Sequence, residues 1–258
     1  MLGVLVLLFA AYELWGTNLR EASAQRDLRR DLERVLATPD PTPRAPLPGD
    51  AVARLEIPKI GLEKAVVEGV GVPDLKKGPG HYPGTPLPGQ PGNAAIAGHR
   101  TTYGAPFWSL DELAPGDEIR ATTRQGEFVY RVTGSQVVRP WENQVLRDEP
   151  GNVLTLTTCN PRFSARQRLI VKAVLVGTAA EAAPGGEPAD VLPSDPFAGD
   201  GSVKAVVLWG LLAAGVALLA WLLARRYHWL LYLPGAALVL LVLFGFFERL
   251  SSILPAGV

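Results

Sequence analysis

The architecture of this chain is predicted from NVLTLTTCNPRFSARQRLIVKAVLVG, residues 152–177, which hold its only cysteine, Cys159. Val153 to Cys159 alternates apolar and polar residues, the period-two pattern of a half-buried β-strand. Gln167 to Val176 is a second run, rich in the β-branched residues that favour strands. Residues 160–166 between them contain turn formers and cannot continue the first strand. The stretch therefore predicts two strands joined by a polar turn.

The register of these strands follows from their apolar residues. If they pair antiparallel with Cys159 opposite Arg168, one face becomes a continuous apolar layer. That layer consists of Leu154, Leu156, Leu169, Val171 and Ala173. A slip of one residue would send this apolar set to the wrong face. Side chains directly opposite each other lie about 5 Å apart at Cβ, so the pattern predicts a thiol beside a guanidinium on a polar, open surface.

Such a pair suits nucleophilic chemistry, because the thiolate is the reactive form of cysteine and nearby positive charge lowers a thiol pKa. A guanidinium can also donate hydrogen bonds to the oxyanion that forms after attack on a carbonyl. A leaving amine needs a general acid, usually histidine. His228 lies between two long apolar runs and is out of reach. His81 lies in a Gly/Pro-rich loop and is interpreted as structural, whereas His99 ends a small apolar strand in NAAIAGHRTTYG and is the better candidate.

These residues resemble the sortases, the cysteine transpeptidases of Gram-positive cell surfaces. The resemblance rests on TLTTC at 155–159, an arginine nine residues later, and IAGHR upstream at 96–100. It covers roughly residues 51–177 and includes RLEIPKIGL at 54–62 and a Gly/Pro-rich block at 78–100. The HRTTYG loop and the Arg-, Pro- and Ala-rich composition look most like class E.

The resemblance implies that Cys159 is the nucleophile, His99 the general acid and base, and Arg168 the oxyanion or substrate-binding residue. Arg166 lies two residues earlier on the same face of the strand and remains the alternative to Arg168 for this role. The substrate groove is expected to be lined by Thr101, Tyr103, Thr157 and Thr158. Neither a cofactor nor a metal is expected.

Composition and strand spacing agree with one catalytic domain at 51–177. A chain of 258 residues with zero net charge implies no nucleic-acid partner, and a single cysteine excludes an intrachain disulfide. Short strands are predicted at 52–57, 63–69, 93–97, 117–123, 127–139, 153–159 and 167–176, with a short helix near 107–113. Many short strands with few helices predict a mainly β fold, here a closed barrel of about eight strands. Glu142, Asp148 and Glu149 are interpreted as a solvated loop in preference to a calcium site.

The N-terminal region is predicted to anchor the chain. Residues 1–16 are apolar but short for a membrane span, which needs about 20 apolar residues. The preferred interpretation is an uncleaved anchor with a truncated N-terminus, and a cleavable signal peptide is the alternative. Residues 17–50 are predicted to form a charged helix and a Pro-rich linker. The arginines of that helix conflict with an outside location unless a basic segment precedes residue 1.

The C-terminal region is predicted to contain a flexible linker at 178–202, two transmembrane helices at 203–248 and a short tail at 249–258. Arg225, Arg226 and His228 in the tight connection place it in the cytoplasm by the positive-inside rule. The paired helices depart from the commonest class E layout. Residues 195–197, Asp-Pro-Phe, are similar to the active-site lid of pilin-polymerising sortases, but that lid precedes the barrel, so a chance match is favoured.

The sequence therefore predicts a membrane-anchored transpeptidase with its catalytic domain on the extracellular side of the cell membrane. By resemblance it cleaves an LPxTG- or LAxTG-like sorting signal between Thr and Gly. It then joins the acyl product to an amine of a cell-wall precursor or pilin. The expected partners are secreted proteins that carry this signal, the amine acceptor and the membrane. A hydrolytic cysteine protease and a non-catalytic anchored β-domain remain the alternatives.

Overall fold

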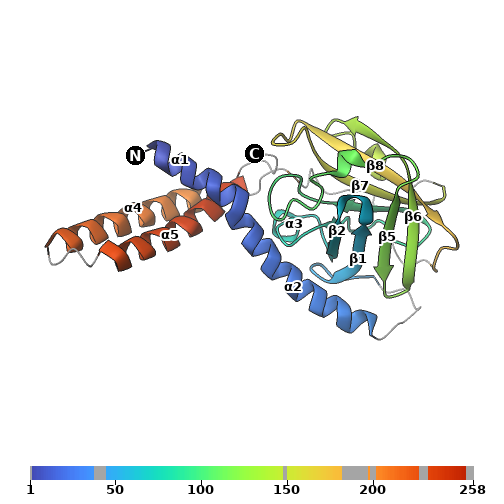
Figure 1. The fold of residues 1–258 in the computed structure, drawn as a ribbon, viewed down its shortest axis with the longest axis horizontal. Helices are drawn as coiled ribbons and strands as arrows, with labels where there is room; N and C mark the ends of the chain where they lie inside the picture. The colour runs from blue at the N-terminus through green and yellow to red at the C-terminus, as the bar shows by residue number, and fades with distance from the viewer. Residues whose placement is uncertain are drawn as a thin grey trace. The chain divides into compact units, whose positions relative to one another are not determined.

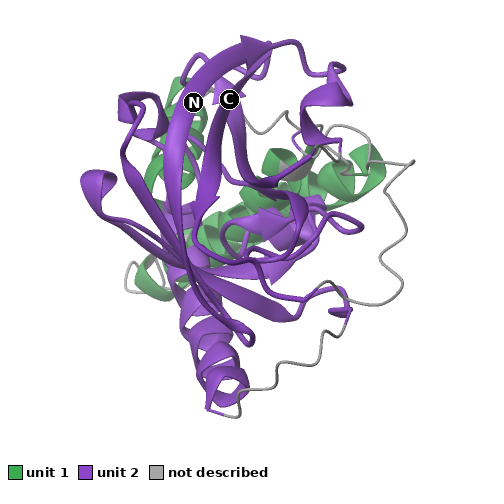
Figure 2. Ribbon diagram, turned by 90° about the vertical axis from the view of Figure 1, so that its right-hand side faces the viewer, with its two compact units in different colours: residues 1–15, 198–255 green, residues 16–197, 256–258 purple. Residues whose placement is uncertain are grey.

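The computed structural model describes residues 2–37, 45–147, 150–181, 197, 202–226 and 232–253. The chain forms two compact units (Figure 2): Met1–Trp15 with Ala198–Pro255, and Gly16–Phe197 with Ala256–Val258.

The larger unit is built on a closed β-barrel (Figure 1), which confirms the predicted fold class. Its strands are β1 (Ala51–Ile57), β2 (Leu62–Glu68), β3 (Gly80–His81), β4 (Gly92–Ala97), β5 (Glu118–Thr123), β6 (Gly126–Val138), β7 (Asn152–Asn160) and β8 (Gln167–Val176). They follow the order β1-β2-β3-β4-β7-β8-β6-β5, and pairing of β1 with β5 closes the barrel. Neighbours are antiparallel except β2 with β3 and β4 with β7.

Most predicted strands match observed ones, and β3 is the exception. It is only two residues long and comes from the Gly/Pro-rich block, so it carries no period-two pattern. Short helical segments fill the connections: the 3₁₀ turns η2 (Pro58–Ile60), η3 (Leu110–Glu112) and η4 (Asn143–Leu146), and the α-helix α3 (Val72–Leu75). The helix predicted near 107–113 is thus a single 3₁₀ turn.

The β7–β8 register is the predicted one. Cys159 pairs with Arg168, and Leu156 pairs with Val171. The predicted apolar layer lies in the barrel core, with Leu154 and Leu156 fully buried. Burial of each such side chain contributes roughly 1.5–3 kcal/mol, which makes a slipped register unfavourable.

Helix α2 (Thr17–Leu36) packs against the barrel along one face. Its Leu28 and Leu32 are buried against apolar residues of β1 and β2. The amide of Gln25 donates to the carbonyl of Ala65 (2.9 Å) and accepts from its N–H (2.9 Å). Helix α2 lies where the charged helix was predicted, and all of it belongs to the barrel unit.

The smaller unit is helical: α1 (Leu2–Ala11), the π-helical turn η1 (Tyr12–Gly16), α4 (Val203–Arg226) and α5 (Tyr232–Ile253). In the described part of the chain, two helical stretches are long and apolar enough to span a membrane, Val203–Leu223 and Leu233–Ser251. Gly245 lets these helices approach closely, because a Cβ there would meet the ring of Trp209 at 2.4 Å. Arg225 and Arg226 end α4, whereas His228 lies outside the described residues.

Candidate active site

Cys159 and Arg168 face each other across the ends of β7 and β8. Their Cα atoms are register partners, and both side chains are on the face opposite the barrel core. Arg168 donates through Nη1 to the carbonyls of Ala165 and Gln167, each at 2.8 Å, which fixes its guanidinium. Arg166 is exposed in the turn before β8. The geometry favours Arg168 as the partner of the thiol.

The predicted open surface around this pair is wrong. Cys159 is 1% exposed and Arg168 is 4% exposed. Cys159 belongs to a second apolar cluster outside the barrel core, with Val70, Leu75, Tyr82, Ala95, Ala97, Leu146 and Phe197. Strand alternation shows which face a residue occupies, but loops distant in sequence cover that face.

His99 reaches the same end of the barrel because β4 runs parallel to β7. Ala97, the last residue of β4, is the register partner of Thr157. His99 and Cys159 each follow their member of this pair by two residues, so they lie at the same level along the two strands. The N–H of Gly98 donates to the Thr157 carbonyl (3.1 Å), and Thr158 Oγ1 donates to the Gly98 carbonyl (2.7 Å). The three residues predicted to carry the chemistry thus meet at the ends of neighbouring strands.

The four predicted substrate-binding residues separate into two groups. Thr157 faces the same side as Cys159 and lines a groove. Thr158 is fully buried on the opposite face, where its Oγ1 donates to the Gly98 carbonyl. Tyr103 packs on the His99 ring with centroids 5.2 Å apart, and Thr101 is 8% exposed in the same turn. We infer that Tyr103 positions His99.

Arg100 was missed by the sequence reasoning. Its Nη1 donates to the Cys159 carbonyl (3.2 Å) and to Asn160 Oδ1 (2.8 Å), while Nη2 pairs with Asp111 at 2.9 Å. Arg162 pairs with the same carboxylate at 3.0 Å. Arg100 is only 2% exposed, so it links the histidine turn to the cysteine strand inside the protein. The position of Arg100 directly after His99 was the only sequence feature that could have indicated its role. Its partners could not be predicted because they are distant in sequence.

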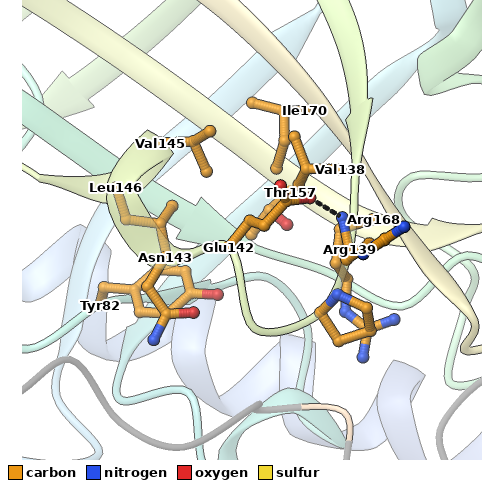
Figure 3. Close-up of a pocket in the computed structure, with 11 residues that line it drawn as sticks. Tyr82, Val138, Arg139, Glu142, Asn143, Val145, Leu146, Thr157, Arg168 and Ile170 are labelled. Carbon is orange, nitrogen blue, oxygen red and sulfur yellow. Dashed lines mark hydrogen bonds between the residues drawn. The ribbon is translucent and has the colours of Figure 1, made fainter.

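A small groove lies beside Arg168 (Figure 3). One wall is formed by residues 139–146, between β6 and β7, and the other by Thr157, Arg168 and Ile170. Buried Asn93 holds this loop by donating to the carbonyls of Val145 (3.2 Å) and Arg147 (3.0 Å). The groove thus includes Arg168, the register partner of Cys159.

His81 and the acidic loop containing Glu142 lie outside this cluster of strand-end residues. His81 is 1% exposed and lies 2.7 Å from the Glu68 carboxylate through Nδ1, which supports a structural role. Glu142 accepts a hydrogen bond from the N–H of Arg139 (2.6 Å), the contact dashed in Figure 3. Asp148 and Glu149, the other members of the acidic loop, lie outside the described residues.

The barrel brings together a thiol, an imidazole and a guanidinium, the kinds of group that serve as nucleophile, acid–base group and oxyanion donor in covalent acyl transfer. The sortase domain family model matches residues 55–176. The structure of a Clostridium perfringens sortase D5 transpeptidase is 32% identical, with a TM-score of 0.51, covering 61% of this chain and 98% of that chain. The chain belongs to the sortase family.

Two curated relatives refine this assignment. Sortase SrtE1 of Streptomyces coelicolor is 35% identical over 185 residues, covering 66% of this chain and 53% of the relative. Sortase D of Bacillus subtilis is 29% identical over 170 residues, covering 62% of this chain and 84% of the relative. The chain spans about half the length of SrtE1, and it is similar to class E sortases as the motifs predicted.

Proposed function

We propose that this protein is a membrane-anchored cysteine transpeptidase that cleaves a C-terminal sorting signal and transfers the acyl product to an amine. The observation that carries the proposal is the direct pairing of Cys159 with Arg168 at the strand ends where His99 also lies. A structural cysteine needs no such partners, since an inert buried thiol behaves as a small hydrophobe. Family membership supports the same chemistry.

In the first half-reaction the thiolate of Cys159 attacks the carbonyl carbon of the Thr–Gly bond. The new C–S bond places negative charge on the carbonyl oxygen, and Arg168 donates hydrogen bonds to this oxyanion. The C–N bond then breaks. His99 gives its proton to the departing glycine amine, which leaves a thioester on Cys159.

In the second half-reaction an amine attacks the thioester carbonyl carbon. His99 now accepts a proton from the amine, a new C–N bond forms, and the C–S bond breaks to regenerate the thiolate. Hydrolysis would follow the same path with water as the acceptor. Partition between the two acceptors therefore separates a transpeptidase from a hydrolytic protease.

The substrate is proposed to be an LPxTG- or LAxTG-like signal on a secreted protein, bound in the groove between residues 139–146 and Thr157. Arg168 lines the groove and is the register partner of Cys159, which supports a peptide bound there with its threonine carbonyl beside the thiol. Likeness to class E sortases supports this substrate class. The proposed acceptor is an amine of a cell-wall precursor or a pilin.

The proposed location is the cell membrane, with the barrel on the extracellular side. The two apolar helices α4 and α5 would cross the bilayer, and residues 1–16 would add a second anchor. Arg225 and Arg226 between the two helices favour a cytoplasmic connection. Anchors on both sides of the barrel would hold its site near the membrane surface.

The proposal is tested with the full chain in detergent micelles, incubated with LPxTG and LAxTG peptides and an excess of a small amine, followed by mass spectrometry. We expect cleavage between Thr and Gly and a product in which the N-terminal fragment is joined to the amine. Peptides with the Thr–Gly pair reversed serve as controls. If the N-terminal fragment appears only as the free acid despite the excess of amine, the protein is a protease. If no peptide is cleaved, the domain is non-catalytic.

A further inference from the structure

Arg100 is a buried arginine to which the proposed reaction assigns no role. It follows His99 directly and is only 2% exposed. Its Nη1 donates to the carbonyl of Cys159 (3.2 Å) and to Oδ1 of Asn160 (2.8 Å). The residue after the candidate general acid thus contacts the backbone of the candidate nucleophile, although 59 positions separate the two in the chain. A side chain placed in this way can fix the two segments relative to each other.

One carboxylate balances the charge of this guanidinium. Nη2 of Arg100 lies 2.9 Å from Oδ2 of Asp111, whose side chain is 42% exposed. Burial of a cation without a partner is strongly unfavourable, so Asp111 stabilises Arg100 in its interior position. Arg162 holds the same carboxylate, with Nη2 at 3.0 Å from Oδ1. Its Nε donates to the carbonyl of Trp108 (3.2 Å), so these contacts join the β7–β8 turn to the segment that carries η3.

The bridge made by Arg100 begins where the strand pairing ends. β4 and β7 are in register as far as Ala97 and Thr157. Two residues further along each segment lie His99 and Cys159. At this level the guanidinium continues the connection between the segments, because its hydrogen bond to Cys159 is to the backbone carbonyl. The side chain is therefore placed to set the separation of the imidazole and the thiol.

We propose that Arg100, kept in place by Asp111, is a positioning residue that fixes the strand end of Cys159 against the turn of His99. The inference rests on the proposed function, in which the thiol and the imidazole act on one bound peptide. A shift of about 1 Å between reacting groups can cost about a hundredfold in rate. Arg100 acts through the Cys159 backbone, so its loss reduces kcat and leaves KM nearly unchanged.

The shape of the guanidinium explains why arginine suits this position. Its planar fork offers several N–H groups in fixed directions, whereas a lysine ammonium is a compact charge on a flexible stem. Two nitrogens of Arg100 serve Cys159, Asn160 and Asp111 at the same time. We expect a lysine there to retain the pairing with Asp111 and to lose the bridge.

The test measures kcat and KM for peptide cleavage by the full chain in detergent micelles. We expect Arg100→Gln to lose about a hundredfold in kcat with KM within about threefold of the parent, and Arg100→Lys to lose about tenfold. Asp111→Asn keeps the shape of its side chain but not its charge, and it is expected to lose about tenfold in kcat. Arg120→Gln is the matched control, since Arg120 is an exposed arginine of β5 that pairs with Glu118 at 2.6 Å. It should keep the parental kcat.

A second measurement separates positioning from folding and needs no turnover. Cys159 is the only cysteine in the chain, so alkylation by iodoacetamide reports its reactivity as a function of pH. Nearby positive charge favours the thiolate. We therefore expect the alkylation profile of Arg100→Gln to move to higher pH, while that of Arg120→Gln stays in place. Arg168 and His99, contributed by β8 and the turn after β4, are present in every variant.

Parental kcat and a parental alkylation profile in Arg100→Gln would overturn the inference, and so would a rise in KM at unchanged kcat. A lower melting temperature with neither change would show a purely structural role and reject positioning. If Arg100→Gln does not fold, the kcat of Arg100→Lys decides between the same outcomes. If the parent cleaves no peptide, a moved alkylation profile in Arg100→Gln would support positioning while the proposed function is rejected.

A separate observation concerns the loop that forms one wall of the groove beside Arg168. Asn93 is fully buried, and its Nδ2 donates to the carbonyls of Val145 (3.2 Å) and Arg147 (3.0 Å). Its Oδ1 accepts from Oγ1 of Thr155 (2.7 Å), on the neighbouring strand β7. One amide from β4 therefore ties the loop between β6 and β7 to the barrel.

We propose that Asn93 and Thr155 are positioning residues for this wall of the groove, again on the basis of the proposed function. Leu146 lies between the two residues whose carbonyls Asn93 holds, and both Val145 and Leu146 line the groove. Loss of the Asn93 amide frees this wall while Cys159 and its partners stay in place. Weaker peptide binding is therefore expected at nearly constant kcat.

Asn93→Asp keeps the shape of the side chain but turns a carboxylate oxygen toward two carbonyls in place of the donor. We expect its KM for the sorting-signal peptide to rise about tenfold with kcat within about threefold of the parent, and Thr155→Val to show a smaller rise. Hydrogen exchange followed by mass spectrometry should show faster exchange of residues 143–147 in both variants. Gln90→Glu is the matched control, because Gln90 is a buried amide that donates instead to Gln125 Oε1 (2.8 Å). It should leave both measurements unchanged.

Unchanged exchange of this loop in Asn93→Asp would overturn the second proposal, and so would faster exchange with an unchanged KM. If Asn93→Asp does not fold, Thr155→Val decides. If the parent cleaves no peptide, the proposed function fails, and peptide affinity measured by isothermal titration calorimetry replaces KM in the same comparison.

Discussion

Cys159→Ala is expected to eliminate both peptide cleavage and the covalent thioester while leaving the protein folded. The thiol supplies the only nucleophile of the proposed reaction, so no alternative side chain can form the intermediate. Its sulfur is buried in an apolar cluster, and its removal leaves a small cavity that costs on the order of 1 kcal/mol. Peptide turnover and intact-protein mass spectrometry are the measurements, and the melting temperature verifies folding.

Cys159→Ser provides the matched variant, because it keeps nearly the same shape and replaces the thiol with a far weaker nucleophile. We expect no thioester with this variant and turnover at or near the background of the peptide alone. Retained cleavage in either variant would reject Cys159 as the nucleophile.

Arg168→Ala and Arg168→Lys are both expected to reduce kcat/KM by about a hundred- to a thousand-fold, the usual effect of losing an oxyanion donor. Lysine keeps the charge but cannot reproduce the planar guanidinium fork. The structure adds a second reason, since the same guanidinium is oriented by two turn carbonyls at 2.8 Å. A lysine ammonium cannot serve these carbonyls and an oxyanion in the same geometry.

Arg166→Ala is the matched control for that experiment. Arg166 carries the same charge two residues away but is exposed and lies outside the β7–β8 pairing. We expect it to keep kcat/KM within about threefold of the parent, since exposed charges contribute little. A crippled Arg166→Ala beside a nearly normal Arg168→Ala would reverse the assignment of the third residue, although the strand register would stand.

Local patterning was sufficient for much of this fold. Strand alternation is a period-two property that neighbouring residues carry, so β7 and β8 and their apolar face were predictable. Their register followed because only one pairing buries Leu154 and Leu156 with the apolar residues of β8. The two apolar helices were equally predictable, since length and composition define them.

The motif residues were also predictable, because Cys159, His99 and Arg168 lie in segments with a characteristic order along the chain. The residues that surround them in the folded protein could not be predicted. Alternation assigns Cys159 to a face of β7, but the cover over that face comes from loops and from Phe197, which are distant in sequence. The exposed thiol expected from the pattern is consequently buried.

The supporting contacts of the site likewise depend on long-range packing. Arg100 reaches Cys159 and Asp111 only because β4 and β7 run side by side, and Thr17 reaches Tyr103 only because α2 packs on the barrel. Such contacts leave no periodic trace in the sequence. A chain's local pattern specifies its elements and their apolar faces, whereas the enclosure and orientation of a site arise from segments that meet only after the barrel has closed.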